Sequence, residues 1–203
     1  MNMQMTARSF LLLALTLTLC PVSALAKDNH HSHTSKYAGQ EKREIKSLSA
    51  YDITELRRGG GWGLAKAAEL NGVPGPIHLL ELKKEIALTD AQIAAITRIY
   101  DGMKAEAVKR GEKLIVLEKE LESHFRNRTV TETILRRSLA AIAEARQALR
   151  FTHLAAHLRT PEILSEAQIR KYNALRGYTK ADPCDAVPKG HNPAMWRKHN
   201  GCK

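Results

Sequence analysis

Apolar residues recur at steps of three and four positions through two long stretches of the chain, and this spacing predicts amphipathic helices. The first stretch runs from Thr89 to about Phe125 and the second from about Thr131 to Leu158. The predicted buried face of the first helix comprises Ile93, Ile96, Tyr100, Met103, Ala107, Leu114, Leu117 and Leu121. That of the second comprises Leu135, Leu139, Ile142, Ala145 or Arg146, Leu149, His153 and Ala156. Because residues 127–129 (Asn-Arg-Thr) have the composition of a turn, we predict an all-α fold built on a long antiparallel helical hairpin.

Shorter elements flank this hairpin. In order, they are a short amphipathic helix or two turns over 40–57, a helix over 64–70, a turn over 71–76 and a final helix over 165–176. Residues 59–63 (Gly-Gly-Gly-Trp-Gly) break any helix, and we expect a hinge or a tight contact there, with Trp62 as a packing anchor. A phosphate-binding P-loop is not indicated, because no strand precedes the glycines and no Gly-Lys-Ser/Thr follows them. Gly102 and Gly111, inside the first long helix, are expected to be mild weak points that cost up to about 1 kcal/mol each.

The N-terminal 26 residues have the parts of an export signal: a positively charged start, an apolar run from Phe10 to Cys20, and small residues before a cleavage site after Ala26. The run is too short to span a bilayer, which takes roughly 20 residues. The alternative is a lipoprotein signal acylated at Cys20, but Leu19 stands where a small residue is expected. We therefore predict export to the periplasm and a mature chain that starts at about Lys27.

Two cysteines, Cys184 and Cys202, remain in the predicted mature chain. In an oxidising compartment an even pair favours a disulfide, which would stabilise the fold by roughly 3 kcal/mol in the loop-entropy model. The alternative is a zinc site with His191 and His199 as further ligands, although these spacings do not match a familiar zinc finger. We expect the disulfide to hold an otherwise irregular C-terminal tail.

Composition narrows the function classes. The 203 residues carry a formal net charge of +11, which favours anionic partners. Aromatic residues make up 5%, which is few for a β-sandwich or a large α/β enzyme. Neither a nucleophile-elbow serine nor an HExxH zinc motif is present, so we predict a protein that is not an enzyme. Export and the few aromatic residues argue against a nucleic-acid partner.

A five-residue pattern occurs twice, as Leu88-Thr89-Asp90-Ala91-Gln92 and as Leu164-Ser165-Glu166-Ala167-Gln168. Each copy combines a hydrophobic staple residue, a hydroxyl N-cap, an acid in the first turn and a glutamine that returns to the cap. Any two well-capped helices could share such a pattern. The centres of the two copies, however, average to position 128 in the predicted turn. The hairpin should therefore bring Gln92 and Gln168 side by side.

The paired Leu-Thr-x-x-Gln pattern, after an export signal and around a long helical hairpin, resembles the Spy/CpxP (LTxxQ) family of periplasmic proteins, which includes heavy-metal-resistance members of the ZraP and CnrX type. The resemblance covers residues 37–178, and the cysteine-containing tail and residues 59–63 depart from the family pattern. It implies a curved all-helical cradle, usually a homodimer. Such a protein would bind unfolded or misfolded periplasmic proteins without ATP, or would act as an envelope-stress adaptor for a membrane sensor protein.

These features divide the chain into a signal peptide (1–26), a His-containing arm expected to be disordered (27–39), a Spy/CpxP-like helical domain (40–178) and an irregular basic tail (179–203). Client proteins would be attracted by a basic surface, for which the candidate contacts are Lys104, Arg110, Arg136 and Arg150. The alternative is that each of these cations only solvates an exposed helix face.

Four residues are candidate ligands of a transition metal. His153 and His157 are four positions apart on one helix, the spacing at which two imidazoles can reach one ion. The hairpin register places Met103 opposite them, and imidazole with thioether suits nickel, copper, cobalt or zinc. His78 is a further candidate, expected to lie far from the pair in a simple hairpin. The alternative is that His153 is a hydrogen-bonded core residue and His157 a surface residue. A metal-binding sensor or resistance protein is therefore the second functional hypothesis.

Overall fold

The computed structural model describes residues 34–179, 187 and 189–202. The chain divides into two units, residues 1–38 and 39–203, and all the helices described below belong to the second. In the described residues the regular secondary structure is entirely helical, which confirms the predicted all-α class. Nowhere in these ranges is a helix both long enough and apolar enough to cross a membrane. The predicted signal peptide and Cys184 lie outside the described residues.

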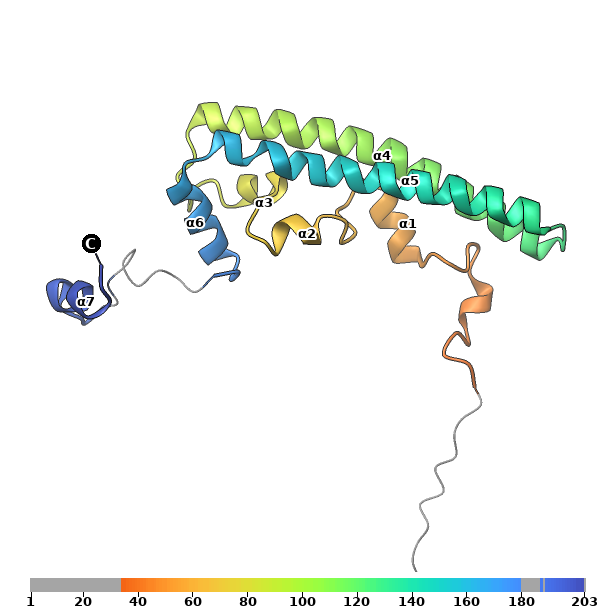
Figure 1. Cartoon of the computed structure of the whole chain (residues 1–203), viewed down its shortest axis with the longest axis horizontal. Helices are drawn as coiled ribbons and strands as arrows, with labels where there is room; N and C mark the ends of the chain where they lie inside the picture. The colour runs from red at the N-terminus through yellow and green to blue at the C-terminus, as the bar shows by residue number, and fades with distance from the viewer. Residues whose placement is uncertain (1–33, 180–186, 188, 203) are drawn as a thin grey trace, which may run out of the picture. The chain divides into compact units, whose positions relative to one another are not determined.

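The two longest helices form the predicted antiparallel hairpin. Helix α4 spans Asp90–Arg126 with 37 residues, and helix α5 spans Glu132–Arg159 with 28 residues. They pack against each other along their lengths, as Figure 1 shows. Thr89 and Thr131 cap the two helix starts by accepting hydrogen bonds from backbone N–H groups of the first turn. Hairpin and turn were thus predicted within a few residues of their observed positions.

One predicted core position of α5 is wrong. Leu139 is 50% exposed, whereas the buried stripe through Ile142 continues towards the turn by way of Ser138 and Leu135, which are half-buried. A pair of helices buries only a narrow stripe of each partner. A residue that lies off this stripe stays in solvent unless a third element covers it.

Shorter helices cover one side of the hairpin (Figure 1). They are α1 (Ala50–Arg57), α2 (Lys66–Glu69), α3 (Pro76–Glu81) and α6 (Glu166–Leu175). Two 3₁₀ turns, η1 (Gln40–Lys42) and η2 (Pro161–Ile163), precede α1 and α6. Helices α1 and α3 pack on α4, and α2 packs on α5. Helix α3 was not predicted, and it begins with a proline at its first turn, where the missing N–H costs nothing. The helix predicted over 64–70 is shorter, because only Lys66–Glu69 is α-helical.

The C-terminal tail contains a helix where an irregular segment was predicted. Helix α7 spans Pro193–His199, and the Asn192 side chain accepts hydrogen bonds from the backbone N–H groups of Ala194 and Met195. An asparagine cap followed by proline is a recognised start signal, and it outweighed the polar composition of the tail. Cys202 is disulfide-bonded.

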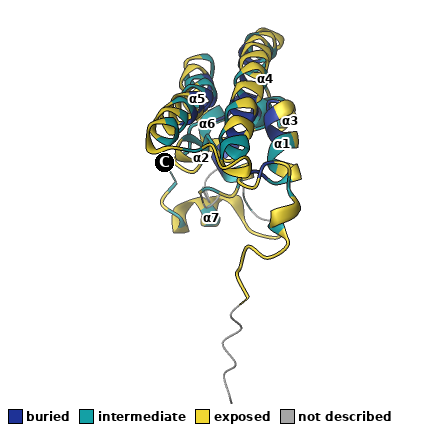
Figure 2. Cartoon of the chain, turned by 90° about the vertical axis from the view of Figure 1, so that its right-hand side faces the viewer, coloured by how far each residue is buried: buried dark blue, intermediate teal, exposed yellow. Residues whose placement is uncertain are grey.

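Two clusters of buried side chains hold the hairpin and the shorter helices together. The larger joins α1 and the segment before it to the middle of the hairpin, through Ile45, Leu48, Leu56, Ala107, Leu114, Ile115, Ile142, Ala145 and Leu149. The smaller joins α3, α4 and α6 through Leu79, Ile86, Ile96 and Tyr172. Figure 2 shows the buried positions turned towards the neighbouring helices and the exposed ones turned outwards. The hairpin alone would leave these apolar faces in water, so the shorter helices are part of its core.

The glycine-rich segment makes the tight contact that was predicted. Gly59 has a φ of +67°, and a Cβ added there would lie 3.0 Å from the backbone carbonyl oxygen of Lys104 on α4. Trp62 packs against the larger cluster, which confirms its role as an anchor. Its indole Nε1 donates a hydrogen bond of 2.8 Å to Asp52 Oδ1, and the guanidinium of Arg146 lies 5.3 Å from its ring centroid. These contacts hold Trp62 at a φ of 44°, a conformation that a bulky residue rarely adopts.

Candidate functional site

The two repeated motifs lie side by side and bind each other through their glutamines. Gln92 Nε2 donates to Gln168 Oε1 at 2.9 Å, and Gln168 Nε2 donates to Gln92 Oε1 at 3.0 Å. The second N–H of each amide reaches the loop before the other helix, at Ile163 O for Gln92 and at Ala87 O for Gln168. The predicted meeting of the two glutamines is confirmed.

Each glutamine also completes a capping box on its own helix. Gln92 Oε1 accepts a hydrogen bond from the backbone N–H of Thr89, and Gln168 Oε1 accepts one from that of Ser165. Leu88 and Leu164 pack against the smaller buried cluster. The motif therefore does two things: it caps the starts of α4 and α6, and it joins these starts to each other.

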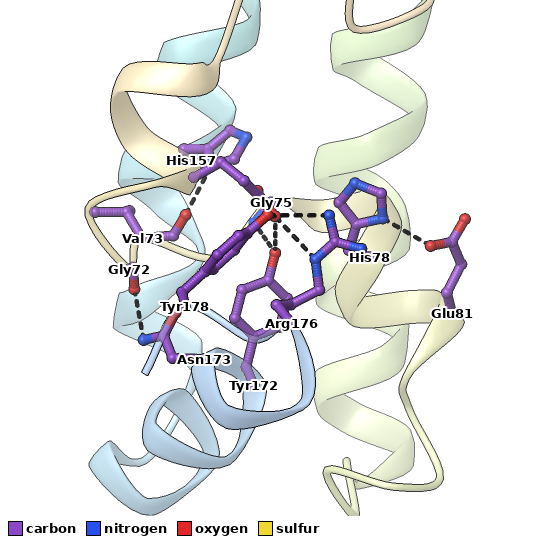
Figure 3. A network of polar contacts seen from close by, with 11 residues as sticks. Gly72, Val73, Gly75, His78, Glu81, His157, Tyr172, Asn173, Arg176 and Tyr178 are labelled. Carbon is purple, nitrogen blue, oxygen red and sulfur yellow. Dashed lines mark hydrogen bonds and ion pairs between the residues drawn. The ribbon is translucent and has the colours of Figure 1, made fainter. Parts of the chain in front are cut away.

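A second polar network fixes α6 to α2. The carboxylate oxygen Oε1 of Glu69 accepts hydrogen bonds from the hydroxyls of Tyr172 at 2.6 Å and Tyr178 at 2.9 Å, and from Arg176 Nε at 3.2 Å. Figure 3 shows the two tyrosines and the arginine converging on this point. Burial raises the pKa of Glu69, but the tyrosine hydrogen bonds and the nearby His78 and Arg176 lower it by more, so the net pKa shift is downward.

The four predicted metal ligands line one cavity of about 540 Å³. His153 and His157 enter it from α5, Met103 from α4 and His78 from α3, while residues 59–63 form another wall. The expectation that His78 lies far from the two α5 histidines is therefore wrong, because α3 folds back against α4. His157, for which a surface position was the alternative, is only 6% exposed.

The histidines of this cavity differ in their hydrogen bonding. His157 Nδ1–H donates to the backbone carbonyl of Val73 at 2.8 Å, so in the neutral ring Nε2 keeps its lone pair. His78 Nδ1 lies 2.7 Å from Glu81 Oε2 (Figure 3). His153 is 3% exposed, and its buried Nε2 has no hydrogen-bond partner among the described residues. Across the described ranges, no three His, Cys, Asp or Glu side chains are grouped so as to hold a metal ion.

A groove of about 520 Å³ is lined by Trp62 and by one face of α5. Its lining residues are Trp62, Leu64, Arg146, Gln147, Leu149, Arg150, Phe151 and Leu154. Phe151 is 63% exposed. Phe151, Leu154 and the 69% exposed Leu158 follow one another at steps of three and four, so an apolar stripe runs along this face of α5.

The four predicted client-contacting cations do not share this groove. Only Arg150 lines it. Lys104 lines the histidine cavity and lies 5.6 Å from the ring centroid of Tyr100. Arg110 is paired with Glu106 at 3.2 Å, and Arg136 with Glu132 at 2.6 Å. Phe151 and Leu154 were not foreseen as site residues, although apolar residues that fall off the predicted buried stripe of α5 were the available signal.

Residues 78–176 match the family model described as LTXXQ motif family protein. The chain belongs to the LTXXQ motif family. This is the Spy/CpxP-type family that the repeated motif indicated, and its individual members are not distinguished by the match. No curated protein and no solved structure matches the chain.

The LTXXQ match covers only part of the site. It includes both motif glutamines, the α5 histidines, Met103, Tyr172 and Arg176, whereas Trp62 and Glu69 precede it and Tyr178 follows it. The groove therefore has one wall from the LTXXQ region and one from the glycine-rich segment. Glu69 and its partners were missed by sequence reasoning, because residues more than a hundred positions apart carry no shared local pattern.

The paired amides of Gln92 and Gln168 predict that a carboxylate at either position lowers the stability of the fold. Gln168→Glu keeps the side-chain shape but replaces the Nε2–H₂ donor with an oxygen that faces Ala87 O and Gln92 Oε1. We expect the free energy of unfolding to fall by about 2 kcal/mol, as measured by urea denaturation. Glu166→Gln, on the same helix turn but 94% exposed at its side chain, is the matched control and should change it by less than about 0.5 kcal/mol. Equal effects of the two variants would contradict the role given to the amide pair.

The buried His153 predicts a pH dependence of stability. Burial, and next the charge of His157, lower the pKa of His153 below its ordinary value of 6.5. The unfolded chain therefore binds a proton more readily than the folded one, so stability is lost as the pH falls below about 6.5 towards the folded pKa. We expect the melting temperature to decline from pH 7 to pH 5, and His153→Leu to flatten this decline. An unchanged slope in the variant would show that His153 is not the group responsible.

Proposed function

We propose that the protein is a non-catalytic periplasmic binding protein that holds unfolded polypeptide segments. The LTXXQ family is of chaperone, adaptor and metal-resistance type and is typically periplasmic, which supports this class of function. The observation that carries the proposal is the groove beside Trp62, which exposes a phenylalanine and leucines next to two arginines.

The groove combines two attractions that an unfolded segment can use. Phe151, Leu154 and the ring of Trp62 offer apolar area, which binds exposed apolar side chains through the hydrophobic effect. Arg146 and Arg150 offer positive charge, and no acidic residue is among the described residues that line the groove. Arg146 is ion-paired with Glu118 at 2.8 Å, so Arg150 is the better placed cation for an acidic client residue. Contacts of this size bind weakly and reversibly, as a holding chaperone requires.

The apolar contribution is tested by a pair of phenylalanines. Phe151→Ser removes an exposed side chain of the groove, whereas Phe125→Ser removes one that is 54% exposed at the last turn of α4, away from the groove lining. We expect Phe151→Ser to weaken suppression of client aggregation without ATP by about fivefold to tenfold and Phe125→Ser to leave it near that of the wild type. Equal activity of all three proteins would reject the groove as the client site.

The charge contribution is tested in the same assay. Arg150→Gln should weaken binding of an acidic client and reduce the salt dependence of binding, because one screened attraction is lost. Arg137→Gln, an exposed arginine of α5 outside the groove lining, is the matched control and should behave like the wild type. A client that binds both variants with unchanged salt dependence would argue against an ionic contact at Arg150. Homodimer formation and an adaptor role towards a membrane sensor stay predictions from the family resemblance.

A second candidate function is transition-metal binding in the histidine cavity. It is favoured by the convergence of His153, His157, Met103 and His78 on one cavity, and by the buried Nε2 of His153 without a hydrogen-bond partner in the described residues. The fit is incomplete, because no three His, Cys, Asp or Glu side chains of the described ranges are grouped to hold an ion. Binding would therefore depend on the imidazoles of His153 and His157 and on the thioether of Met103, and this ligand set favours soft ions such as copper.

Calorimetry with nickel, copper, cobalt and zinc tests this second candidate. If these residues bind a metal, we expect the wild type to bind at least one of the ions with a micromolar or tighter Kd. The double variant His153→Ala plus His157→Ala should lose this binding. The single variant His191→Ala, outside the cavity lining, should keep it. A flat trace for the wild type with all four ions would remove metal binding and leave the holding function untouched.

A further inference from the structure

Residues 186–203, which follow Asp182 and Asp185, carry positive charge and contain no acidic residue. From Ala186 to Lys203 the sequence contains Lys189, Arg197, Lys198 and Lys203 but neither Asp nor Glu. On α4 and α5, by contrast, three cations are paired with glutamates one helical turn away, Arg110 with Glu106, Arg126 with Glu122 and Arg136 with Glu132. The C-terminal segment is therefore a local source of uncompensated charge, which attracts anionic surfaces.

Helix α7 places apolar side chains between two of these cations. Met195 is 73% exposed, and Trp196 follows it. At about 100° per residue, Met195, His199 and the half-buried Trp196 share one arc of the helix, and Arg197 and Lys198 flank that arc on its two sides. The ring of Trp196 meets His191 edge-on at a centroid distance of 4.8 Å. The helix thus shows an aromatic ring and a flexible thioether within reach of long cationic side chains.

The segment that follows α7 folds back on the helix. The Cys202 backbone N–H donates to the carbonyl oxygen of Arg197 at 2.9 Å, and that of Asn200 donates to Trp196 O at 3.0 Å. Gly201, with a φ of +67°, permits this reversal at the helix end. Cys202 is also disulfide-bonded, so the turn that ends α7 carries a covalent link.

We propose that this C-terminal module, residues 189–202, docks on anionic phospholipid surfaces. Tryptophan prefers the interface between headgroups and acyl chains, and lysine and arginine beside it reach the anionic headgroups. An apolar arc flanked by cations is the arrangement of helices that lie in a membrane interface. One short helix gives weak and reversible attachment, which would keep the holding groove near the membrane surface without anchoring the chain.

Co-sedimentation with vesicles tests the proposal. The exported chain from Lys27 is used, because the apolar leader would itself bind lipid. It should sediment with vesicles of phosphatidylglycerol and phosphatidylcholine at low salt, but not with vesicles of phosphatidylcholine alone. Arg197→Gln plus Lys198→Gln should lower partitioning by roughly tenfold or more. Lys109→Gln plus Lys113→Gln, an equal charge change at two exposed lysines of α4, should lower it by less than about threefold.

Tryptophan fluorescence gives a second measurement. Vesicles of phosphatidylglycerol should shift the emission of the wild type to shorter wavelength, and Trp196→Phe should abolish the shift while Trp62 remains. The proposal is overturned if the wild type does not sediment with anionic vesicles, if the α7 and α4 double variants lose binding equally, or if Trp196→Phe retains the shift. None of these outcomes bears on client holding, because α7 is outside the groove lining.

Discussion

Gly111→Ala is expected to lower the free energy of unfolding by about 3 kcal/mol, although alanine is the better helix former. Gly111 is buried on α4, where α1 crosses it closely. A Cβ added there would collide with the carbonyl group of Leu56 and would lie 3.2 Å from the Leu56 Cα. These are backbone atoms, which cannot rotate away as a side chain would. Helix α1 must therefore move outwards, and the larger buried cluster, which includes Leu56, is loosened.

Gly102→Ala is the matched control on the same helix. Nothing lies within 4 Å of a Cβ added at Gly102, which is exposed. Here only helix propensity changes, and we expect a gain of about 0.5–1 kcal/mol. Urea denaturation followed by circular dichroism measures both variants. If Gly111→Ala were as stable as Gly102→Ala, the close approach of α1 to α4 would be wrong.

Glu69→Leu is expected to cost about 2–4 kcal/mol. The leucine leaves two tyrosine hydroxyls and the Arg176 guanidinium without their common acceptor. Tyr172 is fully buried, so its hydroxyl cannot turn to water instead. Since α6 is joined to α2 largely through this carboxylate, hydrogen exchange should show α6 losing protection before the hairpin does.

Glu81→Leu is the control for the loss of a carboxylate on the same side of the hairpin. Glu81 is 57% exposed at its side chain and is hydrogen-bonded to His78, so we expect a change below about 1 kcal/mol. In acid, the wild type should also lose the contribution that Glu69 makes to the free energy of unfolding. The pKa of Glu69 is lowered from its ordinary 4.5, so this contribution is present above that value and is lost as the pH falls below it. A stability difference between Glu69→Leu and the wild type that stays constant below pH 4 would contradict the assignment.

Gly111→Ala and Glu69→Leu should affect client binding differently. Gly111→Ala disturbs the contact between α1 and α4, next to the Trp62 anchor that forms one wall of the groove. Glu69 lines the histidine cavity and not the groove. A folded preparation of Glu69→Leu should therefore still hold clients, whereas one of Gly111→Ala should hold them less well.

The sequence by itself determined the hairpin, its turn and the meeting of Gln92 and Gln168. These features depend on helical periodicity and on caps that act within four residues, and both are local properties of the chain. It also predicted a hinge or a tight contact at residues 59–63, since four glycines in five positions break a helix, and the structure shows the tight contact.

Apart from the Gln92–Gln168 contact, only the tertiary structure decided which residues from different helices meet. The turn over 71–76 leads into α3, which brings His78 to the α5 histidines. Glu69 accepts hydrogen bonds from three donors, one on α6 and two just after it. Gly111 looked like a weak point in a helix but is the position where another backbone passes. Such contacts depend on the crossing points of packed helices, which are set by all the side chains at the interface together and not by any local pattern.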